Sequence, residues 1–204
     1  MPKTSLLVSS VLLASLMVMS VLGPAGAQQS PTVRIRGTIE TVDGPQLAVK
    51  SREGSDMKVR LTDNVTVFGV AKATIAEIKP GSYIGVSAMP EPDGSQRALA
   101  VQIFPESQRG VAEGFRPWDL RPNSTMTNAT VAETDGEIIL VKYKDGEKKV
   151  VVPPDTPIVS FVAGDKSELK PGAKIIIFSA TRKEDGTLEA ACVNVGRDGI
   201  TPPM

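Results

Sequence analysis

The chain contains one sequence pattern twice, and this repeat constrains its fold more than any other feature. The segment Ala76–Ile84 (AEIKPGSYI) returns as Ser167–Ile175 (SELKPGAKI). The run Ala98–Ile103, which follows an Asp-Gly pair, returns as Ala190–Val195, which follows another. A repeat of this length indicates two similar small domains rather than a solenoid of short units. It also provides an internal control, because a residue that the shared fold requires is expected in both copies.

Short runs rich in Val and Ile, with polar residues at alternate positions, predict strands in both copies. The first copy offers Val33–Val42, Leu47–Ser51, Met57–Leu61, Val65–Val70, Tyr83–Met89 and Arg97–Ile103. The second copy offers Thr127–Thr134, Ile138–Tyr143, Lys148–Val152, Ile158–Val162, Lys174–Ala180 and Glu189–Val195. Each copy has one short helical candidate ended by Pro and Gly, at Thr74–Lys79 and Ser167–Lys170. This order predicts an all-β chain of two tandem small Greek-key barrels of the OB type, each with one short helical turn.

Six Asp-Gly dipeptides punctuate the chain, at 43–44, 93–94, 135–136, 145–146, 185–186 and 198–199. We interpret them as tight hairpin turns, because both central residues of a type I′ turn need positive φ. Calcium ligation is the alternative interpretation, but no stretch has the alternating acidic spacing of an EF-hand loop. In the last strand of each copy, alternation predicts inward-facing side chains at Leu99, Val101, Ile103, Ala191, Val193 and Val195.

The N-terminus has the features of a secretory signal peptide. Lys3 is the only charge before an apolar run from Leu6 to Leu22, and Ala25–Ala27 provides a small-x-small cleavage site. A membrane anchor is the alternative, but a run of about 17 residues is at the short limit for crossing a bilayer. We therefore expect cleavage near Ala27, a periplasmic or secreted location, and no membrane insertion after cleavage.

The repeat and the signal peptide together predict the domain organisation. It comprises a signal peptide at 1–27, a first OB-like barrel at 28–104, a linker at 105–124, a second OB-like barrel at 125–199 and a tail at 200–204. The linker is the least repetitive part of the chain, and its prolines and glycines predict irregular structure.

The linker also contains the only Trp of the chain, Trp118, close to Phe115, Arg116 and Arg121. Two interpretations stay open. Trp118 and Phe115 pack between the barrels and fix their orientation, or the segment is a recognition element for a partner or a glycan. Phe115, Arg116, Trp118 and Arg121 form the candidate interaction surface.

Composition and the repeat together argue against most familiar chemistry. The 23 basic and 23 acidic side chains balance, which argues against a nucleic-acid partner. The chain has no His and a single Cys, so the usual activating base and any internal disulfide are missing.

Cys192 aligns with Ala100 of the first copy and is therefore interpreted as a small packing residue. Ser167 begins a Ser-x-x-Lys match, but the first copy has Ala76 there, so we interpret Ser167 as a helix cap. No catalytic residue, metal ligand or cofactor is expected.

The succession of strand, Leu/Ile-Lys-Pro-Gly, strand, Asp-Gly and a final Ala-x-x-Val strand resembles a bacterial exported OB-like domain of unknown function. Two copies of this domain cover nearly all of 33–198. The whole chain, including Phe115–Leu120 and Ser124–Asn128, resembles a group of alphaproteobacterial proteins that often carry the label metal ABC transporter permease. A permease needs several membrane-spanning helices, and the chain after the signal peptide offers no apolar stretch of that length. The resemblance implies fold and exported location, and it transfers no catalytic residue.

These observations favour an exported, non-catalytic binding or interaction protein. Its partner is expected to be an envelope protein or a small ligand. A soluble accessory component of a metal or small-solute transport system is the alternative, and an enzyme without a recognisable motif is the third hypothesis.

Overall fold

The computed structural model describes residues 32–204, and the predicted signal peptide at 1–27 lies outside them. Within that range the protein is all-β, as the sequence predicts. The strands are β1 (Thr32–Asp43), β2 (Gln46–Ser51), β3 (Asp56–Lys72), β4 (Tyr83–Pro90), β5 (Gln96–Ile103), β6 (Gly114–Pro117), β7 (Thr125–Asp135), β8 (Ile138–Tyr143), β9 (Gly146–Val151), β10 (Ile158–Ala163), β11 (Lys174–Arg182) and β12 (Leu188–Gly196). The helices are short 3₁₀ turns, η1 (Ile75–Glu77), η2 (Glu106–Gln108) and η3 (Lys166–Glu168). Across 32–204, no helix is both long enough and apolar enough to cross a membrane.

Two elements differ from the sequence-based prediction. Residues 57–61 and 65–70, predicted as separate strands, belong to the single 17-residue strand β3. The polar residues between them resemble a turn, but a register shift against β12 accommodates them within one strand. Part of the predicted irregular linker forms β6, which pairs with β7.

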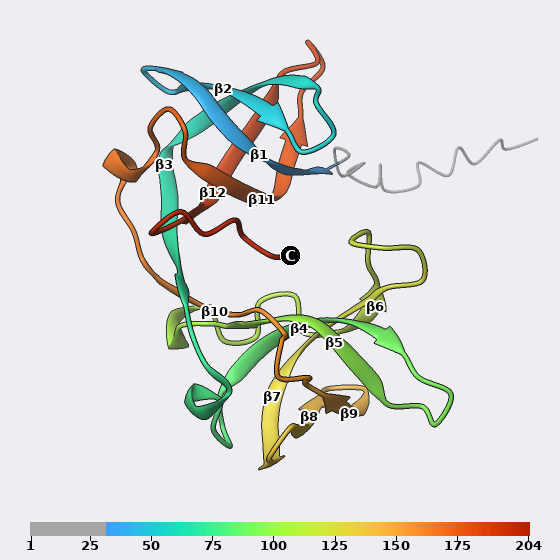
Figure 1. Cartoon of the computed structure of the whole chain (residues 1–204). Helices are drawn as coiled ribbons and strands as arrows, with labels where there is room; N and C mark the ends of the chain where they lie inside the picture. The colour runs from blue at the N-terminus through green and yellow to red at the C-terminus, as the bar shows by residue number, and fades with distance from the viewer. Residues whose placement is uncertain (1–31) are drawn as a thin grey trace, which may run out of the picture.

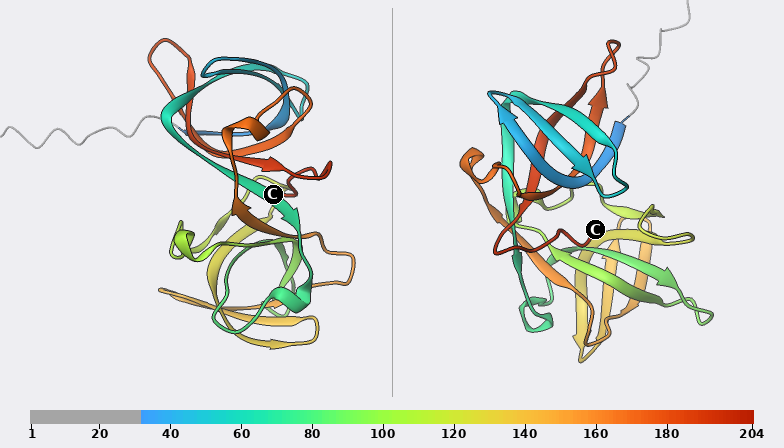
Figure 2. Two further views of the ribbon diagram at one scale, coloured as in Figure 1. Left: turned by 90° about the vertical axis from the view of Figure 1, so that its left-hand side faces the viewer. Right: turned by 45° about the horizontal axis from the view of Figure 1, so that its top comes forward.

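The strands pair in two rings, and each ring takes strands from both copies of the repeat. In the first ring β1 pairs with β2, β2 with β3, β3 with β12, β12 with β11 and β11 again with β1, which closes a barrel. In the second ring β5 pairs with β4, β4 with β7, β7 with β8 and β8 with β9, and a short parallel contact joins β9 to β5. Figure 1 shows the two rings one above the other, and Figure 2 shows them from two further sides. This pairing corrects the predicted division into barrels at 28–104 and 125–199, because neither copy closes a ring by itself.

Two strands carry the chain from one ring to the other. The end of β3 leads through η1 to β4, and β10 leads through η3 to β11. These two crossing strands pair antiparallel, with Val70 opposite Phe161. In a self-contained barrel the chain would turn back within this region, but β3 continues as one strand to Lys72. The strands that follow it, β4 and β5, therefore belong to the second ring.

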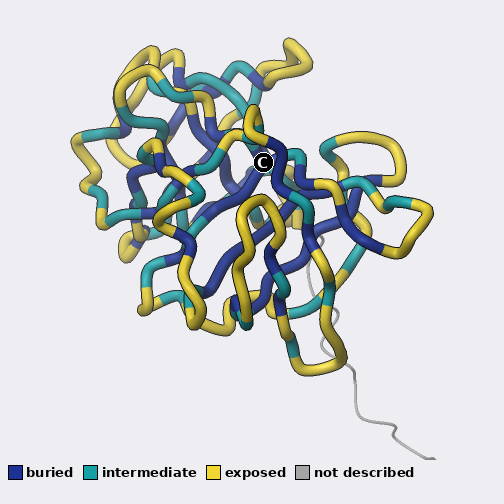
Figure 3. Tube along the Cα trace, turned by 60° about the horizontal axis from the view of Figure 1, so that its bottom comes forward, coloured by how far each residue is buried: buried dark blue, intermediate teal, exposed yellow. Residues whose placement is uncertain are grey.

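Each ring encloses its own apolar core. Large, fully buried members of the first core include Ile35, Ile39, Leu47, Val49 and Val59. Members of the second core include Ile84, Val86, Ile139, Val141 and Val150. The hairpin loops are exposed and the strands between them are largely buried (Figure 3).

The last strand of each copy shows where simple alternation fails. Val101 and Val193 face the cores as predicted, but Ala191 is exposed and Leu99 belongs to neither core. The register shifts beside both positions: β5 has one extra residue between Ala98 and Ala100, and β3 has extra residues opposite Ala190–Cys192 of β12. Such irregularities change which neighbouring residues face inward. Ala98 and Ala190 therefore occupy the cores instead.

The Asp-Gly pairs lie at turns as predicted, but the predicted type I′ geometry and the predicted cap are wrong. Every Asp-Gly glycine has positive φ, whereas Asp198 is the only one of the six Asp residues that does, so the pair does not supply the two central residues of a type I′ turn. Five of the pairs join antiparallel neighbours, and the sixth turns the chain after β12. In η3 the capping residue is Asp165, whose Oδ1 accepts a hydrogen bond of 2.8 Å from the Ser167 amide. Ser167 therefore lies inside the turn that it was predicted to cap.

Aromatic side chains concentrate where the two rings meet. All aromatic residues of the chain except Phe115 and Tyr143 lie in this layer, namely Phe68, Tyr83, Phe104, Trp118, Phe161 and Phe178. Phe161 is central, with ring centroids 5.6 Å from Phe104, 6.2 Å from Phe178 and 6.4 Å from Phe68. The predicted tail also enters this layer, because Met204 is buried there and its carbonyl accepts a hydrogen bond from Arg36 Nε.

Candidate functional site

A cavity of about 380 Å³ lies within the layer between the rings. Its wall takes residues from β1, β11 and β12 of the first ring, from β5 and β7 of the second, and from the crossing strand β10. The remaining wall comes from the segment 105–124, which was predicted as a linker and is called the former linker below; its lining residues lie between η2 and Trp118. The apolar part of the lining includes Phe104, Trp118, Met126, Phe161 and Phe178.

Six polar side-chain atoms in the described range are buried without a hydrogen-bond partner within 32–204, and all six belong to residues that line this cavity. They are Arg34 Nε, Gln102 Oε1, Gln108 Oε1, Trp118 Nε1, Asn128 Oδ1 and Asn194 Oδ1. Leaving a buried donor or acceptor unpaired costs about 1–3 kcal/mol, so most buried polar groups in proteins are paired. The residues that have these atoms converge on one apolar cavity, which makes this cavity the candidate site.

Two of these amides have a fixed orientation. Asn128 Nδ2 donates to the Val111 carbonyl at 3.0 Å, and Asn194 Nδ2 donates to the Ile176 carbonyl at 3.2 Å. The amide nitrogens are therefore occupied, and the oxygens are left as acceptors. Asn128 and Asn194 are only 4% and 2% exposed, so bulk water does not reach them freely.

Equivalent cross-strand rows in the two rings contain these amides, two in the second ring and one in the first. Gln102 lies opposite Gly85, and Gly85 lies opposite Asn128. In the first ring Asn194 lies opposite Ile176, and Ile176 opposite Arg36. Gln102 and Asn194 occupy the same position in the two copies of the repeat. The repeat therefore places one polar row on each side of the layer between the rings.

Gly85 makes room for the row in the second ring. A Cβ at this position would lie 2.7 Å from Gln102 Nε2 and 2.9 Å from Asn128 Oδ1. Both distances are shorter than a Cβ tolerates, so the two amides pack over the bare backbone of β4.

The former linker is held in place by polar contacts. The Val111 carbonyl accepts hydrogen bonds from the Tyr83 hydroxyl and from Asn128 Nδ2, each at 3.0 Å. Burial raises the pKa of Tyr83 to about 12, so the hydroxyl keeps its proton and remains a donor. The Trp118 amide donates to the Ser124 carbonyl at 2.7 Å, which closes the turn that precedes β7.

Among the described residues, arginines are the only charged side chains in the cavity wall. The Arg34 guanidinium lies 3.6 Å from the centre of the Trp118 ring, and that of Arg116 lies 5.6 Å from it. Asp119 lies outside the lining and forms ion pairs with Arg34 at 2.7 Å and Arg36 at 2.6 Å. Arg116 has no ion pair within 32–204; its Nη1 donates to the Ala112 carbonyl at 2.8 Å. Burial, with a smaller contribution from Arg34, lowers the pKa of Arg116, as expected for a cation without a counterion.

Replacing Asp119 with asparagine tests the link that it makes between β1 and the former linker. Partial burial acts to raise the pKa of Asp119, but hydrogen bonds from Arg36 and Arg34 lower it to about 2. The stabilisation is therefore fully present above the unfolded-state pKa of about 4 and is lost as the pH falls through about 2. Because the carboxylate is half-exposed, we expect Asp119→Asn to lower the free energy of unfolding by no more than about 1 kcal/mol at pH 7. Urea unfolding across this pH range measures the difference from wild type; a difference that persists unchanged at pH 2 contradicts the assignment.

The structure separates the members of the candidate interaction surface. Arg116 and Trp118 line the cavity. Phe115 points away from it, because neighbouring residues of β6 face opposite sides, and its ring lies 4.7 Å from Lys148 Nζ. Arg121 is exposed in the turn before β7. Trp118 also packs against Phe178, with centroids 6.4 Å apart, so it contacts both rings and the cavity.

Cys192 lies in the cavity wall on β12 and is partly buried. Burial raises the pKa of its thiol, which keeps the sulfur protonated. Its counterpart in the first copy, Ala100, is fully buried in the same layer.

Sequence reasoning missed Asn128 and the paired amides Gln102 and Asn194. A signal for the pair was present, because both copies carry an amide at the same position of an apolar strand. Alternation assigned these positions to the outside of a barrel, and that assignment is correct. The outside here is the layer between the rings, so the amides are buried.

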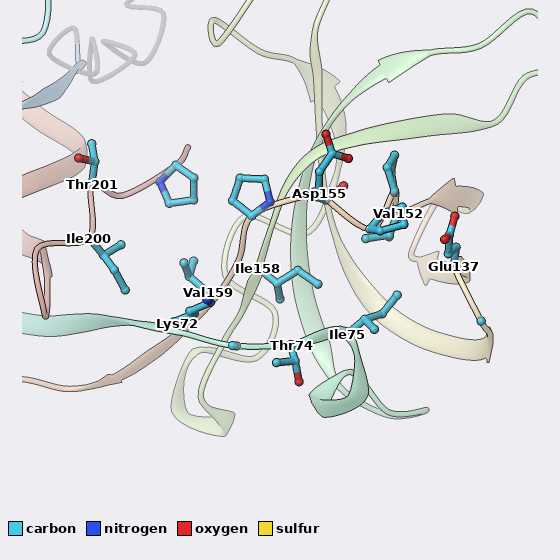
Figure 4. A pocket seen from close by; sticks show the side chains of 17 residues that line it. Lys72, Thr74, Ile75, Glu137, Val152, Asp155, Ile158, Val159, Ile200 and Thr201 are labelled. Carbon is cyan, nitrogen blue, oxygen red and sulfur yellow. The ribbon is translucent and has the colours of Figure 1, made fainter.

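A larger groove of about 770 Å³ lies elsewhere between the rings (Figure 4). Lys72–Ile75, Val152–Val159 and the segment around Ile200 form its walls, and Ile158 and Val159 lie in the middle of the view. None of the unpartnered polar atoms belongs to this groove. It therefore lacks the feature that marks the smaller cavity as a site.

The described part of the chain contains no group of three or more Cys, Asp or Glu side chains placed to hold a metal ion. No protein-family model matches the chain, and neither a curated protein nor a solved structure shows significant similarity to it.

Proposed function

We propose that this protein is a non-catalytic binding module that holds a small organic molecule in the cavity between the two rings. One observation carries the proposal: every residue within 32–204 that has a buried, unpartnered polar side-chain atom lines the same apolar cavity. Its volume of about 380 Å³ is within the range of small-molecule sites. A ligand with donors and acceptors would pair these atoms and remove the cost of leaving them unpaired.

The chemistry of the wall supports binding rather than catalysis. Cys192 and Ser179 are the side chains of the lining that could act as nucleophiles. The chain has no His to activate either of them, and burial raises the pKa of the Cys192 thiol.

We further propose that both rings are OB-type barrels that have exchanged strands. In support, each ring is a closed succession of five strands, and a 3₁₀ turn precedes β4 and β11 at equivalent positions of the repeat. The same proposal includes export to the periplasm and association there with an envelope protein. It also includes the alternative that this protein is itself a soluble accessory component of a transport system, because a module that binds a small solute fits that role.

The only Trp of the chain lines the cavity, so dye binding can test the proposal directly. We expect 1-anilinonaphthalene-8-sulfonate to bind the folded protein and to quench Trp118 fluorescence by energy transfer. Cys192→Phe would fill the cavity from β12 and is expected to weaken binding at least about tenfold, since overfilled sites exclude ligands. The matched control is Ala191→Phe, because Ala191 is the neighbouring, exposed residue of the same strand. Binding that Cys192→Phe leaves unchanged, or no binding to the wild type, contradicts the proposal.

A further inference from the structure

The polar atoms of the cavity specify more than the presence of a ligand. They fall into a donor group and an acceptor group, and charged side chains of only one sign are in the wall. This inference rests on the proposed function and defines the ligand class.

The unpartnered donors lie close together. They are Arg34 Nε and Trp118 Nε1, and the guanidinium carbon of Arg34 lies 3.6 Å from the centre of the Trp118 ring. Both donate N–H groups, and one of them belongs to a cation. A carboxylate has two oxygens that accept such hydrogen bonds, and charge-assisted bonds of this kind are roughly twice as strong as neutral ones.

The charge balance of the wall also favours an anion. Arg34 and Arg116 line the cavity, and no carboxylate from residues 32–204 does. Asp119 is already shared between Arg34 and Arg36. Within 32–204 the side chain of Arg116 makes one hydrogen bond, to the Ala112 carbonyl, and it is repelled by Arg34. A ligand carboxylate would supply the counterion that Arg116 lacks.

The acceptors require hydrogen-bond donors on the rest of the ligand. Asn128 Oδ1 and Asn194 Oδ1 come from opposite rings, and their orientation is fixed by the bonds that their nitrogens make. Each needs an O–H or N–H group from the ligand. An acid without such groups would leave both oxygens buried and unpaired, which is strongly disfavoured.

The apolar lining favours a flat ring between these polar ends. Phe104, Phe161 and Phe178 contribute ring faces and edges, and Trp118 closes the donor end. Aromatic pairs are stabilised beyond simple burial by about 0.5–1.5 kcal/mol. We propose that the cavity binds a small aromatic carboxylate that carries at least two hydroxyl or amide N–H donors.

Isothermal titration calorimetry with matched probes tests the proposal on the complete protein. The probe is 3,5-dihydroxybenzoate. The amide 3,5-dihydroxybenzamide keeps the ring and donors but loses the charge, and 3,5-dimethoxybenzoate keeps the charge but loses the donors. We expect each change to weaken binding at least about tenfold, as expected when a charged or buried hydrogen bond is lost. Glucuronate, which has charge and donors without an aromatic ring, is expected to bind more weakly than the probe by a similar factor.

Each comparison can overturn one part of the inference. Equal binding of the benzamide refutes the anion site, equal binding of the dimethoxy acid refutes the acceptor site, and tighter binding of glucuronate refutes the aromatic requirement. If the dye binds in the cavity but none of the acids does, the ligand class is wrong although the proposed function stands.

Arg116→Gln gives an independent test. This variant is expected to weaken binding of 3,5-dihydroxybenzoate at least about tenfold and to leave binding of the benzamide unchanged. The matched control is Arg121→Gln, because Arg121 is an exposed arginine of the same segment that does not line the cavity. If Arg116→Gln weakens both probes equally, Arg116 acts on the shape of the cavity and the counterion role is refuted.

Discussion

Replacing Phe161 with alanine is expected to lower the free energy of unfolding by about 3–5 kcal/mol, the range for removing a large buried aromatic side chain. Phe161 is 5% exposed and packs against Phe68, Phe104 and Phe178. These neighbours come from different parts of both rings, so they cannot all move in to fill the space. Because small proteins are stable by only about 5–15 kcal/mol, this single change removes a large share of the total.

Chemical denaturation of Phe161→Ala and wild type measures this effect. Phe115→Ala is the matched control, because Phe115 is 40% exposed and lies outside the layer between the rings. We expect the control to change stability by less than about 1 kcal/mol. Similar losses for both variants would show that the aromatic layer does not hold the rings together.

Separating the two copies of the repeat is expected to abolish folding of each half as a monomer. A fragment of residues 32–110 contains β1 to β5, and a fragment of residues 111–204 contains β6 to β12. In the first fragment β1 and β3 lack their partners β11 and β12, and in the second fragment β7 and β9 lack β4 and β5. Neither fragment can therefore form a ring as the intact chain does, and mixing the two is expected to restore both rings.

Circular dichroism and gel filtration of each fragment, alone and mixed, test this expectation. The control is the full chain with a protease site at Gly110, cut after folding, whose two pieces should remain associated. A half that is monomeric and unfolds cooperatively by itself would show that each copy can close its own barrel. That result would contradict the pairing described above.

Much of the fold could be predicted from the sequence, because strands and turns are local. Alternating Val and Ile runs located the strands, and the glycines of the Asp-Gly pairs, which adopt positive φ easily, located the turns. The exchange could not be predicted, since the last strands of the two copies have the same pattern and either pair can complete either ring. The register shifts beside Leu99 and Ala191 could not be predicted either, because they depend on how each strand pairs with its partner.

The candidate site was predicted in part. The repeat isolated Arg116 and Trp118 by showing that the shared scaffold does not explain them, and both line the cavity. Gln102, Asn128 and Asn194 were not found, because a buried amide on the outside of a barrel has the same sequence pattern as a solvent-exposed one. Only the packing of one ring against the other distinguishes the two cases.

The crossing of β3 and β10 between the rings also affects the order in which the molecule can form. The second ring needs no strand beyond β9, but the first ring needs both β11 and β12. During synthesis the outer edges of β1 and β3 therefore stay unpaired, and the apolar faces of β1 to β3 stay uncovered, until β12 is complete. Pairings between such distant segments make folding slow and expose intermediates to aggregation. A nascent chain of this protein thus stays without its N-terminal barrel until β12 has been made, so any factor that protects it must act on β1 to β3 for nearly the whole of synthesis.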